Sequence, residues 1–189
     1  RQGHEVVVIT KFREHDYSAF LKEAPIKLKT WRGGRLPSLR DAKRNPLALI
    51  TRVIKRLLLV LFEYPAIEDM FHVRKMLTKE MGYDMMISFA VPYPVQWGVA
   101  WARKSKRQIS RVWIADCGDP YMGDVLDSFR KPFYFSYLEK NFCRKADFIS
   151  IPVESAISAY YPEFHHKIRI IPQGFMFDLG AKETNKQPG

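Results

Sequence analysis

The chain has 189 residues, of which 47% are hydrophobic and 27% charged, and it carries a formal net charge of +11. This length and apolar content suffice for one domain with a substantial core and exclude an intrinsically disordered chain. No run of about 18 uncharged apolar residues occurs, so no transmembrane helix is predicted. The two cysteines, Cys117 and Cys143, lack metal-ligand spacing and favour two free thiols in a reducing compartment over a disulfide framework.

Apolar and β-branched residues fall into short runs that predict strands, and segments with helical spacing lie between them. Six strands are predicted, at residues 6–10, 26–31, 84–89, 111–115, 148–153 and 168–171. Helices are predicted at residues 46–62, 66–81, 94–105, 132–145 and 154–161. The first helix begins at Asn45-Pro46, an N-cap residue followed by a proline at the first helical position, and the second ends at Gly82.

Most of these strands are apolar on both faces, which is typical of a parallel sheet covered by helices on both sides. The alternation of strands and helices predicts an α/β fold, a three-layer Rossmann-like domain with a mostly parallel sheet. We expect the strands at 6–10, 84–89 and 111–115 to be central. In such sheets ligands bind at the carboxyl ends of the strands.

The loops that follow three predicted strands have an unusual composition. AVPYPVQWG follows residues 84–89, DCGDPYMGD follows 111–115, and PQGFMFD follows 168–171. They concentrate prolines, glycines, aromatic residues and acids, which indicates loops that position functional groups on a rigid scaffold. The sequence contains no P-loop, dinucleotide-binding fingerprint or zinc-ligand spacing.

Three segments carry a resemblance to a known family: GHEVVVIT, RVWIADCGDPY and RKADFISIPVESAISAYYPEFHHKIRIIPQGF. In order and spacing they resemble the N-terminal half of glycosyltransferases with the two-domain GT-B architecture. The resemblance is closest to the retaining, family-four-like enzymes that build bacterial surface polysaccharides. It covers residues 3–175.

The resemblance implies a domain organisation. Residues 1–178 would form the Rossmann-like N-terminal domain without its first strand, and 179–189 a polar tail or the start of a linker. The donor-binding C-terminal domain would lie outside this chain. The full-length protein is then expected to be a hexosyltransferase-type enzyme that uses a nucleotide-sugar donor and needs no metal or other cofactor. This chain alone is expected to be inactive, and its sequence leaves the oligomeric state open.

The same resemblance, together with the loop positions, selects candidate site residues. Asp116 and Asp119 are the candidate catalytic residues, because a carboxylate near the reacting sugar accepts a hydroxyl hydrogen bond and favours positive charge on the ring. For Asp119 a turn-capping role is the open alternative. The candidate acceptor-binding residues are Ser88, Tyr93, Gln96, Gly118 and Tyr121. Loop packing is the alternative for the first three. Gly174 is assigned to the backbone turn that leads into the linker.

The positive charge is concentrated in one stretch. Residues 27–56 hold ten basic residues and one acid, Asp41, a net charge of +9. An anionic membrane surface is the predicted partner, since this block adjoins a strongly apolar helix. The residues assigned to it are Arg32, Arg35, Arg40, Lys43, Arg44, Arg52, Lys55 and Arg56. A solvated basic surface, or an apolar helix buried against the sheet, remains the alternative.

The predicted partners are a nucleotide-sugar, a polysaccharide or lipid-linked acceptor, and anionic lipid. The predicted location is the cytoplasm, with a peripheral position on the inner face of the cell membrane left open. The competing interpretation is a non-catalytic module that binds membrane or nucleic acid. Nucleic acid is disfavoured, because the basic block has no binding motif and Trp31 is its only aromatic residue.

Overall fold

The computed structural model describes residues 3–12, 17–23, 26–32, 46–103, 108–124, 130–172 and 174. Four residues assigned above to a membrane surface, Arg35, Arg40, Lys43 and Arg44, lie outside these described residues, as does the tail at 179–189.

Within the described ranges, six parallel strands form two sheets. One sheet pairs β1 (Val6–Lys11) with β2 (Ile26–Trp31), and Val6 lies opposite Ile26. The other has the order β3 (Tyr83–Phe89), β4 (Ser110–Asp116), β5 (Phe148–Ile151) and β6 (Ile168–Ile170). All described pairings are parallel, and helices alternate with strands along the chain. The predicted Rossmann-like α/β fold is confirmed.

The helices match the predicted positions and differ at their ends. They are α2 (Pro46–Phe62), α3 (Ile67–Leu77), α4 (Pro94–Ala102) and α5 (Phe135–Lys145). Pro94 occupies the first turn of α4, where its missing N–H costs no hydrogen bond. The predicted helix 154–161 is a 3₁₀ helix, η1 (Glu154–Ala159). Two short elements were not predicted: α1 (Ser18–Glu23) and a second 3₁₀ helix, η2 (Pro162–Lys167).

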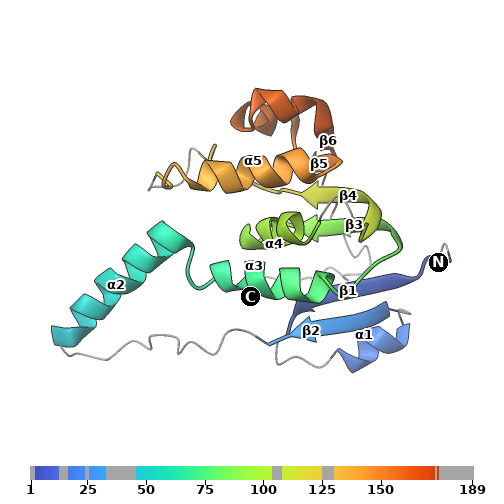
Figure 1. Ribbon diagram of the computed structural model, residues 1–189, viewed down its shortest axis with the longest axis horizontal. Coiled ribbons are helices and arrows are strands. Elements are labelled where there is room, and N and C mark those ends of the chain that lie inside the picture. Colours follow the sequence, from blue (N-terminus) through green and yellow to red (C-terminus); the bar gives the residue numbers. More distant parts are fainter. Residues whose placement is uncertain are drawn as a thin grey trace, which may run out of the picture.

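The core lies between the four-stranded sheet and the helices α3, α4 and α5, which follow one another across the sheets in Figure 1. Trp113, Ile149 and Phe142 are essentially inaccessible to solvent. Helices α3 and α4 approach closely at Gly98, where an added Cβ would lie 2.6 Å from the Met70 carbonyl oxygen. Any larger side chain there would force the two helices apart.

Two of the three strands expected at the centre lie at sheet edges. Among the described strands, β3 pairs only with β4, and β1 only with β2, so of the three only β4 is interior. The apolar run of β3 suggested burial on both faces. Its alternate residues Met85, Ile87 and Phe89 are instead more than half exposed, whereas Ser88 is buried. Only the face of β3 toward α4 is well covered.

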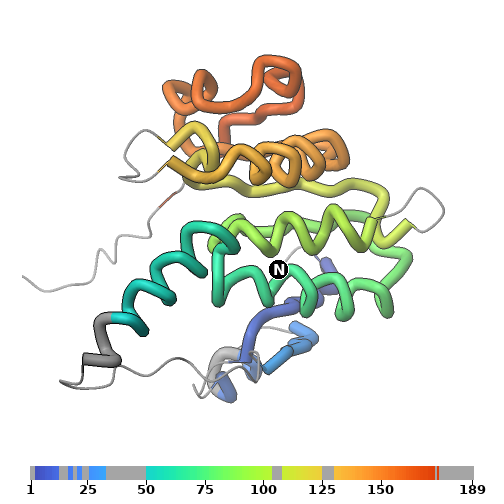
Figure 2. Tube along the Cα trace, turned by 60° about the vertical axis from the view of Figure 1, so that its left-hand side comes forward, coloured from blue at the N-terminus to red at the C-terminus, as the bar shows by residue number. Residues whose placement is uncertain are grey.

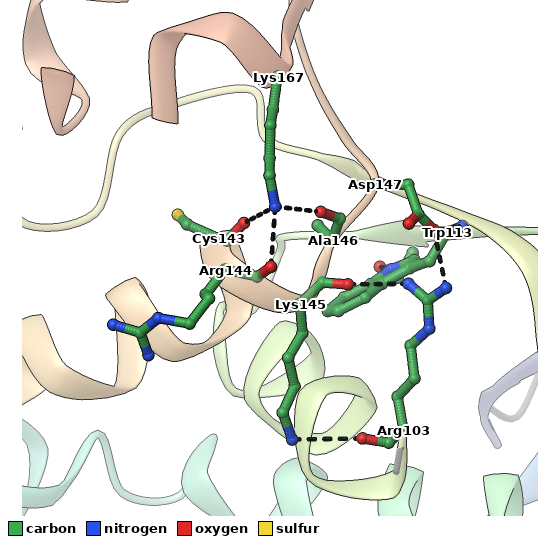
Figure 3. A network of polar contacts seen from close by, with 9 residues as sticks. Arg103, Trp113, Cys143, Arg144, Lys145, Ala146, Asp147 and Lys167 are labelled. Atoms are coloured by element: carbon green, nitrogen blue, oxygen red, sulfur yellow. Dashed lines mark hydrogen bonds and ion pairs between the residues drawn. The ribbon is translucent and has the colours of Figure 1, made fainter. Parts of the chain in front are cut away.

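A lysine caps the C-terminal end of α5 (Figure 3). The Lys167 ammonium donates to three carbonyl oxygens at 2.8 to 3.1 Å, those of Cys143, Arg144 and Ala146. A cation at a helix C-terminus satisfies the last carbonyls and complements the helix dipole.

An arginine from the end of α4 reaches the same place. Arg103 donates to the Lys145 carbonyl and pairs with the Asp147 carboxylate, both at 2.8 Å. Asp147 in turn accepts from the backbone N–H of Trp113 in β4. The RKAD segment at 144–147, part of the resemblance above, is therefore built into the scaffold.

Candidate functional site

The carboxyl ends of β3, β4 and β5 lie next to one another. Phe89 lies opposite Asp116, and Asp116 opposite Ser150. Two backbone hydrogen bonds extend the pairing past the strand ends, from Ala90 N–H to the Asp116 carbonyl and from Cys117 N–H to the Ser150 carbonyl. The loops AVPYPVQWG and DCGDPYMGD therefore begin side by side, as the parallel arrangement requires.

Asp116 is partly buried and held in place. Its Oδ1 accepts a hydrogen bond of 2.5 Å from the Ser150 hydroxyl, so β5 orients the carboxylate that β4 carries. An ionised carboxylate has about four lone-pair sites, so this bond leaves acceptor capacity for a ligand.

Asp119 is exposed, and its backbone carbonyl accepts a hydrogen bond. The Tyr93 hydroxyl donates to the Asp119 carbonyl oxygen, which ties the loop after β4 to the start of α4. Within the described part of the chain, no side chain or backbone group pairs with the Asp119 carboxylate. The alternative of a turn cap has no supporting bond among these residues, and the carboxylate is accessible from solvent.

Aromatic rings support this loop. The Tyr93 and Tyr121 rings lie 4.8 Å apart, and Trp97 contacts Tyr121 edge-on at 5.3 Å. Tyr121 is buried, and its hydroxyl donates to Glu63 Oε1 at 2.7 Å. Burial raises the pKa of Tyr93 far above its usual value, so its phenol remains a hydrogen-bond donor. Because Tyr121 is buried and bonded to Glu63, it anchors the loop. Gly118 in the same loop is partly accessible to solvent.

Ser88 and Gln96 are buried inside the scaffold. Gln96 Nε2 donates to the Ser88 carbonyl at 2.9 Å and to the Asp116 carbonyl at 3.2 Å, while its Oε1 accepts from the Ser88 hydroxyl. The Trp113 indole N–H donates to Ser88 Oγ at 2.7 Å. These contacts join β3, β4 and α4 next to the candidate site. They support a positioning role, and direct contact with an acceptor stays a prediction.

A buried acid that was not predicted from the sequence contacts the same loop. Glu139 is 2% exposed and accepts hydrogen bonds from the Tyr161 hydroxyl at 2.8 Å and from Met122 N–H at 3.5 Å. Burial is the main cause that raises the pKa of this carboxyl. A signal was present in the sequence, because Glu139 lies four residues after Phe135 and three before Phe142, on the apolar face of α5.

The remaining candidates lie apart from this edge. Gly174 has open space at its Cβ position and needs no left-handed backbone, so its linker role stays a prediction. The Arg32 guanidinium lies over the Phe12 ring at 5.7 Å, beside the end of β2. Three further cations, Arg52, Lys55 and Arg56, lie on α2.

Neither cysteine has the exposed, low-pKa thiol of a reactive site. Cys117 and Cys143 are free, buried thiols, and burial raises the pKa of each. Among the described residues, no three His, Cys, Asp or Glu side chains are placed to hold a metal ion. No helix in this part of the chain is long and apolar enough to cross a membrane.

Comparison with known proteins leaves the family open. No protein-family model matches the chain, and searches of the curated proteins and of the solved structures find no match either. The resemblance to GT-B glycosyltransferases therefore stays a prediction that rests on the three sequence segments.

Proposed function

We propose that this chain is the acceptor-side domain of a retaining, hexosyltransferase-type glycosyltransferase, which moves a sugar from a nucleotide-sugar to a polysaccharide or lipid-linked acceptor. The observation that carries the proposal is the accessible Asp119 carboxylate at the carboxyl edge of a parallel sheet, near the oriented carboxylate of Asp116. Ligands of α/β sheets bind at this edge, and carboxylates are strong acceptors for hydroxyl groups.

The chemistry assigns roles to these residues. In glycosyl transfer the bond from the anomeric carbon to the diphosphate oxygen breaks, and the acceptor hydroxyl oxygen bonds to that carbon. The hydroxyl proton passes to the departing diphosphate. Positive charge develops on the sugar ring as the diphosphate departs. A carboxylate close to the ring stabilises that charge more in the transition state than in the ground state. Asp119 takes this role, and Asp116 orients a hydroxyl.

In this proposal the chain supplies half of the machinery. The phosphates of the donor need cations or a helix N-terminus, which the resemblance assigns to a second domain. This chain by itself then neither transfers sugar nor binds nucleotide-sugar tightly. Its proposed place is the cytoplasm or the inner face of the cell membrane. The second candidate function, a non-catalytic membrane-binding module, is favoured by the exposed apolar residues of α2.

Saturation-transfer NMR with a panel of monosaccharides and oligosaccharides tests the acceptor site, and calorimetry with UDP- and GDP-sugars tests the division of labour. We expect at least one carbohydrate to bind weakly, Asp119→Asn to weaken that binding, and nucleotide-sugars not to bind tightly. Asp84→Asn is the matched control, because Asp84 is an exposed acid at the opposite end of β3. Low-micromolar binding of a nucleotide-sugar, or no carbohydrate binding at all, would overturn the proposal.

A further inference from the structure

Helix α2 projects away from the rest of the chain. Both views show it running outward from the N-terminal end of α3, beyond the two sheets (Figures 1 and 2). Within the described residues it makes no extensive packing contact with another helix or strand. The alternative that this apolar helix is buried against the sheet is therefore wrong for the described part of the chain.

One face of α2 is an exposed apolar stripe. Its members recur mostly at spacings of three and four residues, which places them together on the helix surface: Ile50, Val53, Ile54, Leu57 and Leu61. Their exposed fractions are 57%, 52%, 45%, 52% and 39%, so the described chain leaves a large part of each uncovered.

The cations of α2 lie on its opposite face, which they share with Leu59, a leucine that is 39% exposed. At about 100° per residue, Arg52, Lys55 and Arg56 fall within one sector on the side away from the apolar stripe. No acid occurs between Pro46 and Phe62. A helix with an apolar face and a Lys/Arg face is the form that lies in a membrane interface, with its charges among the headgroups.

Exposed aromatic side chains stand at the start of α5, which a hydrogen bond joins to the end of α2. The Tyr134 hydroxyl donates to the Leu61 carbonyl, which joins the two helices. Beside Tyr134, Phe133 and Tyr137 are 76% and 67% exposed, with their ring centroids 6.5 Å apart. Amphipathic aromatic side chains are enriched at the membrane–water interface, where an apolar body meets a hydrated tip.

We propose that the apolar stripe of α2 and the Phe133–Tyr137 pair form one docking surface for an anionic lipid bilayer. The sign of the partner's charge follows from the three cations of α2 and from Arg130, which is exposed and lies close in sequence to the aromatic pair. Nucleic acid would match the cations and leave the apolar stripe in water. A bilayer interface satisfies both faces at once.

This surface is coupled to the candidate site. Glu63 directly follows α2, and its carboxylate accepts the hydroxyl of Tyr121, two residues after Asp119. A docked α2 would therefore hold the carboxyl edge of the sheet near the lipid. Only one consequence of docking, that the acceptor is lipid-linked, rests on the proposed function. Docking itself requires no sugar transfer.

Vesicle co-sedimentation tests the charge requirement. The vesicles contain phosphatidylcholine alone or with about a third phosphatidylglycerol, in about 0.1 M and about 1 M salt, where the screening length falls from about 10 to about 3 Å. Binding should need the anionic lipid and weaken in high salt. Arg52→Gln with Arg56→Gln should lower partitioning about 25-fold, since each charge contributes about fivefold. Lys75→Gln with Lys79→Gln, a pair of exposed cations at the end of α3, is the matched control.

A second set of variants tests the apolar part. Ile54→Gln with Leu57→Gln, and separately Phe133→Ser with Tyr137→Ser, should each reduce partitioning by about tenfold or more with little change in melting temperature. Met81→Gln, which removes an apolar side chain that is 68% exposed elsewhere, should leave binding unchanged.

Three results would overturn the proposal: equal binding to neutral vesicles, no binding at low salt, or an unaltered affinity in both apolar variants. A dimer that the Ile54/Leu57 variant converts to monomer, with vesicle binding unchanged, would assign the stripe to a second copy of the chain. Carbohydrate binding is measured separately without lipid, so failure of docking and failure of the proposed function are distinguishable.

Discussion

Replacement of Gln96 by leucine should destabilise the protein strongly, because the Gln96 amide is the buried link between β3, β4 and α4. Leucine has nearly the right size, so the cavity is small and the lost polar contacts dominate. The Ser88 hydroxyl would lose its acceptor in a buried position, whereas the Asp116 carbonyl still accepts from Ala90 N–H at 2.9 Å.

The magnitude follows from these contacts. A buried polar group left unsatisfied costs about 1–3 kcal/mol, and each lost hydrogen bond contributes about 0.5–1.5 kcal/mol. We therefore expect Gln96→Leu to lower the free energy of unfolding by about 2–4 kcal/mol, a large part of the usual total of about 5–15 kcal/mol. For a chain of this length the melting temperature should fall by about 4–16 °C.

Urea unfolding of four proteins measures the effect: the wild type, Gln96→Leu, Ser88→Ala and the double variant. Because the two side chains share one network, the double variant should lose less than the sum of the single losses, by about 1 kcal/mol or more. Ser155→Ala, at an exposed serine, is the control. A loss below about 0.5 kcal/mol for Gln96→Leu, the usual range of surface substitutions, would refute the reasoning.

Four further outcomes are expected. Asp119→Asn should reduce carbohydrate binding, and should reduce turnover in an active full-length enzyme. The melting temperature should change little, because the exposed Asp119 carboxylate has no partner among the described residues. A lower melting temperature with intact function would mark Asp119 as a turn cap. Gly98→Ala should cost about 1–3 kcal/mol in urea unfolding, because the new Cβ would meet the Met70 carbonyl at 2.6 Å. Burial raises the pKa of the Glu139 carboxyl, so the folded state holds this proton more strongly than the unfolded chain does. The protonated carboxyl therefore stabilises the fold at low pH, and this stabilisation is lost as pH rises above 4.5, the ordinary pKa of a glutamate. In Glu139→Gln the free energy of unfolding, measured in urea across this pH range, should no longer fall for this reason. A pH profile identical to that of the wild type would contradict the role of Glu139. Lys167→Met should destabilise, because three carbonyl oxygens at the end of α5 lose their shared donor, and an unchanged urea midpoint would argue against this cap.

The strand positions and the edge that carries the site were predictable because they depend on local patterns. Short apolar runs predicted all six strands, and the parallel topology then placed the loops after β3 and β4 side by side. The edge position of β3 was not predictable. An apolar run reads the same whether one or both faces are covered, and the number of neighbouring strands is a long-range property.

The roles of individual polar residues were harder to predict. Ser88, Gln96 and Tyr121 stand where a ligand-binding residue would stand, yet their burial depends on how α4 and the loop after β4 pack. Glu139 was missed because it is followed by Lys140 and Asn141, a local composition typical of a solvated helix face. Its spacing from the apolar residues of α5 nevertheless marks it as buried. A polar residue on an apolar helix face is therefore a stronger signal than a polar residue in a loop.

The loop after β4 is anchored from several elements, which bears on how the site works. Glu139 accepts from Met122 in this loop and from Tyr161 in the segment after β5. Tyr93 fixes the same loop through the Asp119 carbonyl, and Tyr121 ties it to the end of α2. The backbone that carries Asp119 is thus held from three sides, which fixes the place of the loop and leaves the carboxylate itself unengaged by the described residues. A rigid loop lowers the reorganisation needed to bring a side chain to a ligand, so the arrangement suits a group that becomes ordered once a ligand is bound.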